Sequence, residues 1–277
     1  MREWAGVSTN AHGVVVSLSL ERNSELGGPT LPLQLGSLDR LETLSVFSTK
    51  LGGQLPGAAL AKLSRLGSLR LNNTFISGVI PADMCHGLGS LRELCLNDTC
   101  LSGGIPSEIG LLTSLETLDL SASEFRPKMN LTGPIPSCLC QLTRLKKLWL
   151  QRTRLSGPIP PGIGNLVSLS HFYAFDTNLS GPLPHSLGLC RHLTYLHLSH
   201  TKVSGHLPGE LGQLTCLEEL YLSNTNVSGA LPPELRFLSN LKRLWLSDTR
   251  LSGALPRDLG NMVRLRYLCL SNTLVEG

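Results

Sequence analysis

Leucines recur along the chain in groups of three with the spacing L-x-x-L-x-L. In the segment from Leu217 to Leu222, the side chains of an extended chain alternate, so Leu220 and Leu222 point one way and Tyr221 the other. The same frame starts at residues 15, 41, 66, 91, 115, 145, 169, 193, 217, 241 and 265. The pattern predicts eleven short strands in register, each with one apolar face.

Each predicted strand is followed by a bend, a proline and leucines at a different spacing. In the frame that starts at residue 217, Gly229 suits a tight bend and Pro232 ends the extended segment. Leu235, Leu238 and Leu241 then recur at a spacing typical of a helix. One such unit cannot cover its own leucine face, so the repeats must stack to bury it.

The L-x-x-L-x-L frame, the G-x-[IL]-P tail and the 24-residue period together resemble the plant-type leucine-rich repeat family. The resemblance covers residues 15–277 as eleven repeats, with the last one truncated and six residues inserted near 124–130. It implies an α/β solenoid, a right-handed superhelix with a parallel β-sheet on the concave face. Short helical or 3-10 segments are then expected on the convex side.

One position departs from that family throughout the chain. The plant-type repeat has asparagine at its ninth position, where the amide bridges neighbouring turns, whereas this chain has mostly threonine, as in some protozoan and algal repeats. The threonines are Thr49, Thr74, Thr99, Thr153, Thr177, Thr201, Thr225, Thr249 and Thr273. A hydroxyl both donates and accepts, so we expect an inward-facing structural ladder that replaces part of the amide bridge.

The two ends of the chain also carry signals. Residues 1–14 resemble the capping segment of plant-type arrays, with Trp4 expected to cover the first repeat, although Arg2 and Thr9 stand where that segment has cysteines. The last frame stops at Gly277 without a polar cap. Solenoids need caps for solubility, so either the natural chain continues or the last repeat packs on something. We expect a monomer or a fragment of a longer chain.

The outward strand positions carry the candidate binding residues. The position between the second and third leucine holds rings in five consecutive repeats, and neighbouring positions add further rings and cations. The predicted ligand-binding residues are Trp149, Tyr173, His197, Tyr221, Trp245, His171, Tyr195, Phe175, Arg152, Lys147, Arg243 and Tyr267. Trp, Tyr and Arg are the residues that anchor protein interfaces, so a protein or peptide ligand on the concave face is the leading expectation. The alternative is that these rings only pack against one another, as aromatics do on strands. The insertion precedes the first ring and could form a lip over that end.

Composition and motifs narrow the classes of function that remain. Charged residues make up 16% of the chain and its net charge is +4 without a dense basic block, which disfavours nucleic acid. The apolar runs are too short to span a bilayer. The chain has no phosphate-binding loop, H-E-x-x-H or G-x-S-x-G motif, so we expect no enzyme and no cofactor. A metal site at His171, His197 and His200 is a weak alternative.

The sequence carries opposing signals about the cellular compartment. Eight cysteines without aligned partners, and no signal peptide after Met1, favour the cytoplasm if Met1 is the true start. Five N-x-[ST] matches would suit a trimmed cell-surface ectodomain; they begin at Asn72, Asn97, Asn130, Asn178 and Asn226.

Three functions therefore remain: a protein- or peptide-binding module, a segment of a larger receptor-like kinase or signalling protein, and a structural or adhesive surface protein. The last would use regular polar columns on ice or carbohydrate; its candidate serines are Ser77, Ser102, Ser156, Ser180, Ser204, Ser228 and Ser252.

Overall fold

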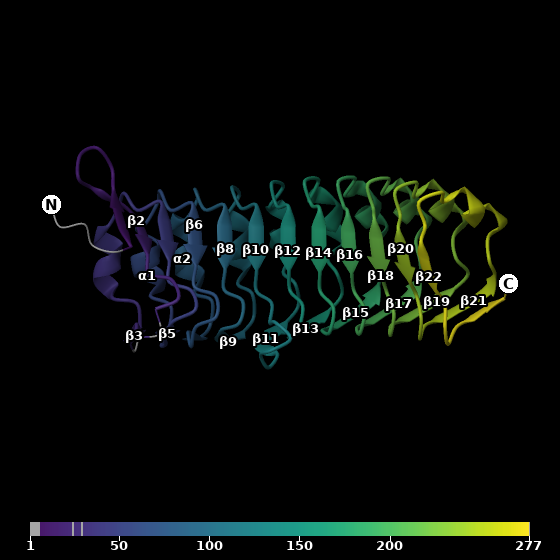
Figure 1. Ribbon diagram of the computed structural model, residues 1–277, viewed down its shortest axis with the longest axis horizontal. Helices are drawn as coiled ribbons and strands as arrows, with labels where there is room; N and C mark the ends of the chain where they lie inside the picture. Colours follow the sequence, from purple (N-terminus) through teal and green to yellow (C-terminus); the bar gives the residue numbers. More distant parts are fainter. Residues whose placement is uncertain (1–5, 24, 29, 277) are drawn as a thin grey trace.

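The chain forms a solenoid of stacked turns that curves along its length (Figure 1). The computed structural model describes residues 6–23, 25–28 and 30–276. The expected contact of Trp4 with the first repeat lies outside the described residues. The two ends of the solenoid lie at opposite ends of the long axis.

The first sheet contains the predicted strands, one from each L-x-x-L-x-L segment. Its strands in spatial order are β1 (Val7–Thr9), β2 (Val15–Ser19), β4 (Thr43–Ser45), β6 (Ser68–Arg70), β8 (Glu93–Cys95), β10 (Thr117–Asp119), β12 (Lys147–Trp149), β14 (His171–Tyr173), β16 (Tyr195–His197), β18 (Glu219–Tyr221), β20 (Arg243–Trp245) and β22 (Tyr267–Cys269). Strands β2 to β22 pair in parallel, whereas β1 pairs antiparallel with β2. The predicted parallel sheet of a leucine-rich repeat solenoid is therefore confirmed.

Short helical turns return the chain along the other side. They are η1 (Leu33–Ser37), α1 (Gly57–Leu60), α2 (Ala82–Gly87), η2 (Ser107–Leu111), η3 (Ser137–Gln141), η4 (Pro161–Asn165), η5 (His185–Leu189), η6 (Gly209–Gln213), η7 (Pro233–Phe237) and η8 (Arg257–Asn261). A proline precedes each one, as in Pro208 before η6, whose carbonyl accepts a bond from Leu211 N at 3.1 Å. Gly188 allows the turns to stack closely, because a Cβ there would meet the Glu210 carbonyl oxygen at 2.4 Å.

A second sheet, which the sequence reasoning missed, runs along the flank of the solenoid. Its strands in sequence order are β7 (Ser77–Gly78), β9 (Cys100–Gly103), β11 (Met129–Gly133), β13 (Thr153–Gly157), β15 (Asn178–Pro182), β17 (Lys202–His206), β19 (Asn226–Gly229), β21 (Arg250–Ala254) and β23 (Leu274–Glu276). A two-stranded sheet of β3 (Gly27–Gly28) and β5 (Lys50–Leu51) precedes it. The T-x-[VL]-S-G segment thus forms a strand with alternate residues buried, where a turn was expected.

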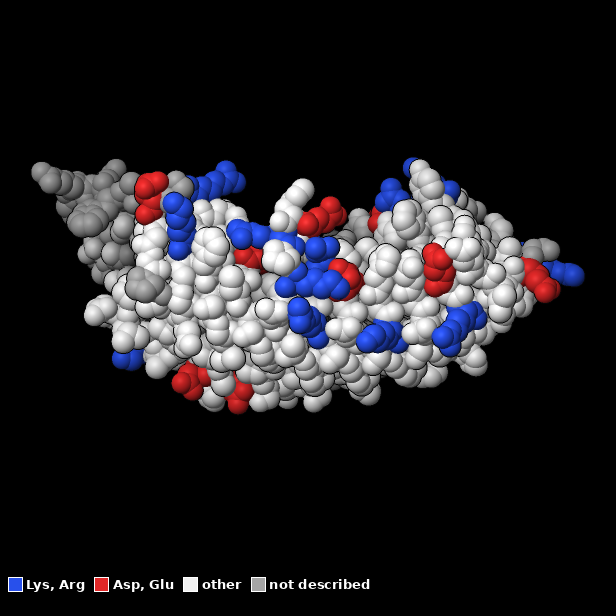
Figure 2. All heavy atoms as spheres, turned by 90° about the horizontal axis from the view of Figure 1, so that it is seen from below, with Lys and Arg blue, Asp and Glu red and all other residues white. Residues whose placement is uncertain are grey.

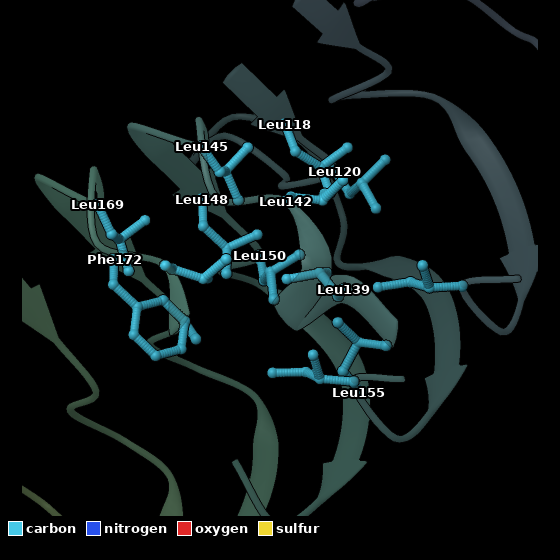
Figure 3. Close-up of a cluster of buried hydrophobic side chains, with 14 of the residues drawn as sticks. Leu118, Leu120, Leu139, Leu142, Leu145, Leu148, Leu150, Leu155, Leu169 and Phe172 are labelled. Atoms are coloured by element: carbon cyan, nitrogen blue, oxygen red, sulfur yellow. The ribbon is translucent and has the colours of Figure 1, made fainter. Parts of the chain in front are cut away.

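The leucine faces of all turns merge into one core. Figure 3 shows a central part, where leucines from β10, η3 and β12 pack around Phe172 of β14. Leu118, Leu148 and Phe172 are each fully buried. Each repeat therefore contributes to a core that it shares with its neighbours.

The ladder threonines lie beside this core, and eight of the nine are buried. Their hydroxyls donate within their own repeat: Thr201 Oγ1 donates to the Leu198 carbonyl at 2.7 Å, and Thr225 Oγ1 to the Leu222 carbonyl at 2.7 Å. This differs from the expected bridge between turns. A hydroxyl on Cβ is too short to replace an amide that reaches the next turn.

Candidate ligand-binding site on the concave face

A row of rings crosses the concave sheet from β12 to β20. We call Trp149, Tyr173, His197, Tyr221 and Trp245 the aromatic file. Parallel register places each of them directly beside the next across the strands. The file exists because the last residue of each of these strands lies between two buried residues and faces outward.

Three members of the file are in close ring contact. His197 and Tyr221 have ring centroids 4.7 Å apart, and Tyr221 and Trp245 meet edge-on at 5.1 Å. Phe175, at the end of its turn, stacks on His197 at 4.2 Å. Trp245 is 41% exposed, so the far end of this cluster presents an open indole face.

Rings in the neighbouring column join the same surface. His171 and Tyr195 lie beside each other in register, with ring centroids 4.7 Å apart. Tyr173 approaches both Tyr195 and His197 edge-on, at 6.5 and 6.1 Å. The structure therefore brings seven of the predicted residues, Trp245 among them, into one contiguous aromatic surface.

Charged side chains fix the C-terminal part of that surface. The Tyr221 hydroxyl donates to Glu219 Oε2 at 2.6 Å, and the Arg243 guanidinium pairs with the same carboxylate. Arg243 also lies over the Tyr267 ring, 5.5 Å from its centroid. Burial and the hydrogen bond to Glu219 raise the pKa of Tyr221 to about 12, so its hydroxyl stays a donor at neutral pH.

Trp149, Lys147 and Arg152 lie apart from this cluster. Among the described residues Trp149 makes no ring contact with the file; the Lys147 ammonium lies over its ring, 5.3 Å from the centroid. Arg152 pairs with Asp176 at 3.7 Å at the edge of the sheet. The predicted set of residues therefore divides between a tight cluster on β14 to β22 and an outlying β12 group.

A hollow of about 480 Å³ adjoins the clustered rings. His197, Tyr221 and Trp245 line it together with His200, which the sequence offered only as a possible metal ligand. Its other lining residues include Ser199, Ser223, Asn224, Ser247 and Asp248, which were not among the predicted ligand-binding residues. The Ser223 hydroxyl is buried without a hydrogen-bond partner among the described residues. A serine column two residues after the file was a visible signal that the sequence reasoning did not use.

Burial controls the charge of the central histidine. Desolvation, with a smaller contribution from His200, lowers the pKa of His197 to about 4, so His197 is neutral at pH 7. Within the described part of the chain no group of three or more His, Cys, Asp and Glu could hold a metal ion. His197 instead stacks on Phe175, and His171 packs on Tyr195.

The same outward column behaves differently in the N-terminal repeats. Ser45, Cys95 and Asp119 occupy it and are 1%, 9% and 7% exposed, whereas Arg70 in the same column is exposed. Asp119 Oδ1 accepts bonds from the backbone and hydroxyl of Ser121, while burial raises the pKa of Asp119 to about 6. The ligand-sized rings and the hollow thus belong to the C-terminal half alone.

The inserted loop contacts residues that closely follow β12 and β14, since the Arg126 carbonyl accepts a bond from Arg152 Nη2 at 3.2 Å. It projects beside β11 at the lower edge in Figure 1. Arg126 bonds to Asn73 and lies over the Phe75 ring, and Lys128 pairs with Asp176 at 2.6 Å. These contacts hold the loop beside Arg152 and Asp176, and a lip over this end of the file stays a prediction.

Comparisons with known proteins agree with this architecture. A family model described as a leucine-rich repeat region matches residues 180–276, and a second leucine-rich repeat model matches residues 90–112 and 144–166. No curated protein matches the chain in sequence. No helix among the described residues has the length and apolar character to cross a bilayer.

Several solved structures are similar over most of this chain. The Arabidopsis receptor kinase HAESA, in complex with the peptide hormone IDA and the co-receptor SERK1, is 28% identical over 99% of this chain and 48% of its own, with a TM-score of 0.78. A TDR receptor is 26% identical over 90% of this chain and 46% of its own, with a TM-score of 0.76. A plant ice-binding protein is 26% identical over 99% of this chain and 78% of its own, with a TM-score of 0.74. The chain thus spans about half the length of the receptor chains that it matches. By its repeats, its two sheets and these matches, the chain belongs to the leucine-rich repeat family, with repeats of the plant type.

Proposed function

We propose that the concave face from β14 to β22 binds a protein or peptide ligand without catalysing a reaction. The observation that carries the proposal is the contact of His197, Tyr221 and Trp245 with one another along the wall of a hollow. A volume of about 480 Å³ lies within the range of ligand pockets, about 300–1,000 Å³.

The chemistry of the surface suits a peptide ligand that is apolar on one side and polar on the other. The rings offer rigid apolar contact at a low cost in side-chain entropy. Ser199, Ser223 and Asn224, which also line the hollow, offer hydroxyl and amide groups. An extended peptide has side chains for the rings and backbone amides for those polar groups, whereas a purely apolar ligand would leave the Ser223 hydroxyl buried without a partner.

Similarity to peptide-hormone receptors supports the same proposal and extends it to the larger protein. HAESA was solved with a peptide hormone and covers this chain almost completely, while this chain spans 48% of HAESA. We therefore propose that these repeats are the recognition segment of a receptor-like protein. The full-length transcript tests this part: a kinase or membrane-spanning segment encoded in frame would support it, and a transcript that encodes only these repeats would contradict it.

The binding proposal is tested with a displayed library of random peptides selected on the wild-type protein. The enriched peptide is then measured against Trp245→Ala and against Phe237→Ala, a ring on the convex side that is 52% exposed against 41% for Trp245. Loss of a buried aromatic anchor should weaken binding by about 2 kcal/mol, which is roughly 30-fold, while the Phe237 variant binds as the wild type does. No enriched peptide, or equal binding to both variants, would overturn the proposal.

Adhesion to ice is a second candidate function, favoured by the similarity to a plant ice-binding protein. The second sheet would be the contact surface, since it repeats its serines at a regular strand spacing. Arg154, Lys202 and Arg250 stand on that sheet, however, and their long charged side chains interrupt the regular rows of hydroxyls. An ice-recrystallisation assay tests this candidate function. Inhibition of ice-crystal growth at micromolar protein would support it, and crystal growth equal to that in an albumin control would rule it out.

A further inference from the structure

The outward side chains of β13 to β21 form a regular polar lattice on the flank of the solenoid. One row is Arg154, Asn178, Lys202, Asn226 and Arg250; the other is Ser156, Ser180, Ser204 and Ser228. Parallel register places each serine beside the next member of the first row, as Ser180 lies beside Lys202 and Ser228 beside Arg250. The leucines and valines between these rows are buried, which fixes the direction of the polar side chains.

The cations of this lattice differ from the other basic residues near the two sheets. At the concave face Lys146, Lys242 and Arg243 each pair with a glutamate. Among the described residues, by contrast, the side chains of Arg154 and Lys202 have neither an ion pair nor a hydrogen bond, and the same holds for Arg250.

Carboxylates are missing from the lattice itself. Strands β13, β15, β17, β19 and β21 contain no Asp or Glu. The acidic residues just ahead of β15 and β21 are already bonded: Asp176 accepts from Lys128, and Asp248 accepts from Asn272 at 2.7 Å. Asp248 is bonded only to the neutral amide of Asn272, so it keeps its negative charge two residues ahead of Arg250. Within the described residues, however, no carboxylate forms an ion pair with Arg154, Lys202 or Arg250, and the serines and asparagines of the lattice can both donate and accept.

The lattice also has a length and a direction. Arg154 and Arg250 are four strands apart, which corresponds to about 19 Å, and a cation stands at every second strand. Figure 2, which views the molecule from this side, shows basic side chains in a row along the lower part of the face, with uncharged surface between them. A ligand that matches it must be linear and must repeat its negative charge.

We infer that this flank binds a linear acidic polysaccharide, a polyuronate whose carboxylates meet the cations and whose hydroxyls meet the serines and asparagines. Single-stranded nucleic acid is a poorer match, because strands β13 to β21 carry no Phe, Tyr or Trp and their one exposed ring is the imidazole of His206, whereas stacking along a strand needs a ring for successive bases. An anionic membrane is also a poorer match, since insertion needs apolar side chains that these outward positions lack. The site is separate from the proposed peptide site, which lies on the other sheet.

The test measures the binding of polygalacturonate by calorimetry. The variant is Arg154→Gln/Lys202→Gln/Arg250→Gln, and the control is Lys62→Gln/Arg65→Gln/Arg144→Gln, which removes the same charge from three exposed cations outside the lattice. The protein is made without N-glycosylation, because Asn178 and Asn226 also begin N-x-S sequons. Thermal melts confirm that both variants are folded.

The wild type should bind polygalacturonate, more weakly as salt rises, and neutral dextran should not bind. Removal of three exposed charge contacts should weaken binding roughly tenfold, while the control variant binds as the wild type does. No binding by the wild type, or an equal loss in both variants, would overturn the inference. Tighter binding of phosphatidylserine vesicles or single-stranded DNA than of polygalacturonate would overturn the choice of a polysaccharide.

Discussion

At the scale of single residues, each ladder threonine closes its own turn. Thr201 Oγ1 donates to the Leu198 carbonyl and accepts from Val203 N at 3.4 Å, and its side chain is 7% exposed. The hydroxyl therefore satisfies backbone groups at the corner where the chain passes from one sheet to the other. Burial makes these bonds costly to lose, because water cannot replace them.

Replacement of Thr201 by valine keeps the shape of the side chain and removes both bonds. We predict that Thr201→Val lowers the free energy of unfolding by about 1–3 kcal/mol, whereas Thr201→Ser, which keeps the hydroxyl, loses less. Urea unfolding followed by circular dichroism measures both. A valine variant as stable as the wild type would show that the ladder hydroxyls have no structural role.

Asp119 gives a prediction that depends on pH. Its pKa is raised in the folded state from 3.8 to about 6, so the folded chain holds this proton more tightly than the unfolded chain does. The contribution of Asp119 to stability is thus full below pH 3.8 and is lost as the pH rises through 6. Asp119→Asn mimics the protonated form, and we predict a higher melting temperature than the wild type at pH 7 and an equal one near pH 3.5. A variant that melts below the wild type at pH 7 would refute this account.

At the scale of elements, the features that depend only on alternation inside one repeat were predictable from the sequence. These are the strands of the concave sheet and the column of rings on them, because two leucines fix the direction of every residue between them. The hollow was not predictable, since it depends on how residues such as Ser199 and Ser223, from different repeats, lie together in space. The second sheet was missed because the five residues from Asn226 to Ala230 read equally well as a turn. The burial of Asp119 depends on its neighbours in adjacent repeats.

The inserted loop is an element whose order depends on a few long side chains. Arg126 and Lys128 reach residues about fifty positions away, on either side of the loop. We predict that Arg126→Ala/Lys128→Ala speeds amide hydrogen exchange in residues 124–128, with little change in the overall melt, because the core of the neighbouring turns stays intact. Arg154→Ala/Lys202→Ala, two cations without such contacts, serves as the control. Exchange in the loop that is the same in both variants would mean that these contacts do not order it.

At the scale of the whole molecule, the stacked repeats separate three surfaces on one rigid frame. The concave sheet carries the rings and the hollow, the flank carries the polar lattice, and the convex side carries the helical turns (Figure 1). Because the core of each turn packs on that of its neighbours and the three surfaces lie on different sides, a change on one surface should leave the others unaffected. This separation is what makes the proposed sites testable independently.

The most direct test of the central claim is hydroxyl-radical footprinting of the wild-type protein with and without the selected peptide. Bound peptide should protect Trp245, Tyr221 and His197 from oxidation. Phe237 on the convex side and Phe125, which is 95% exposed in the inserted loop, should be oxidised equally in both samples. Protection of Phe237 or Phe125, with Trp245 and Tyr221 still oxidised, would contradict the claim that the concave aromatic surface holds the ligand.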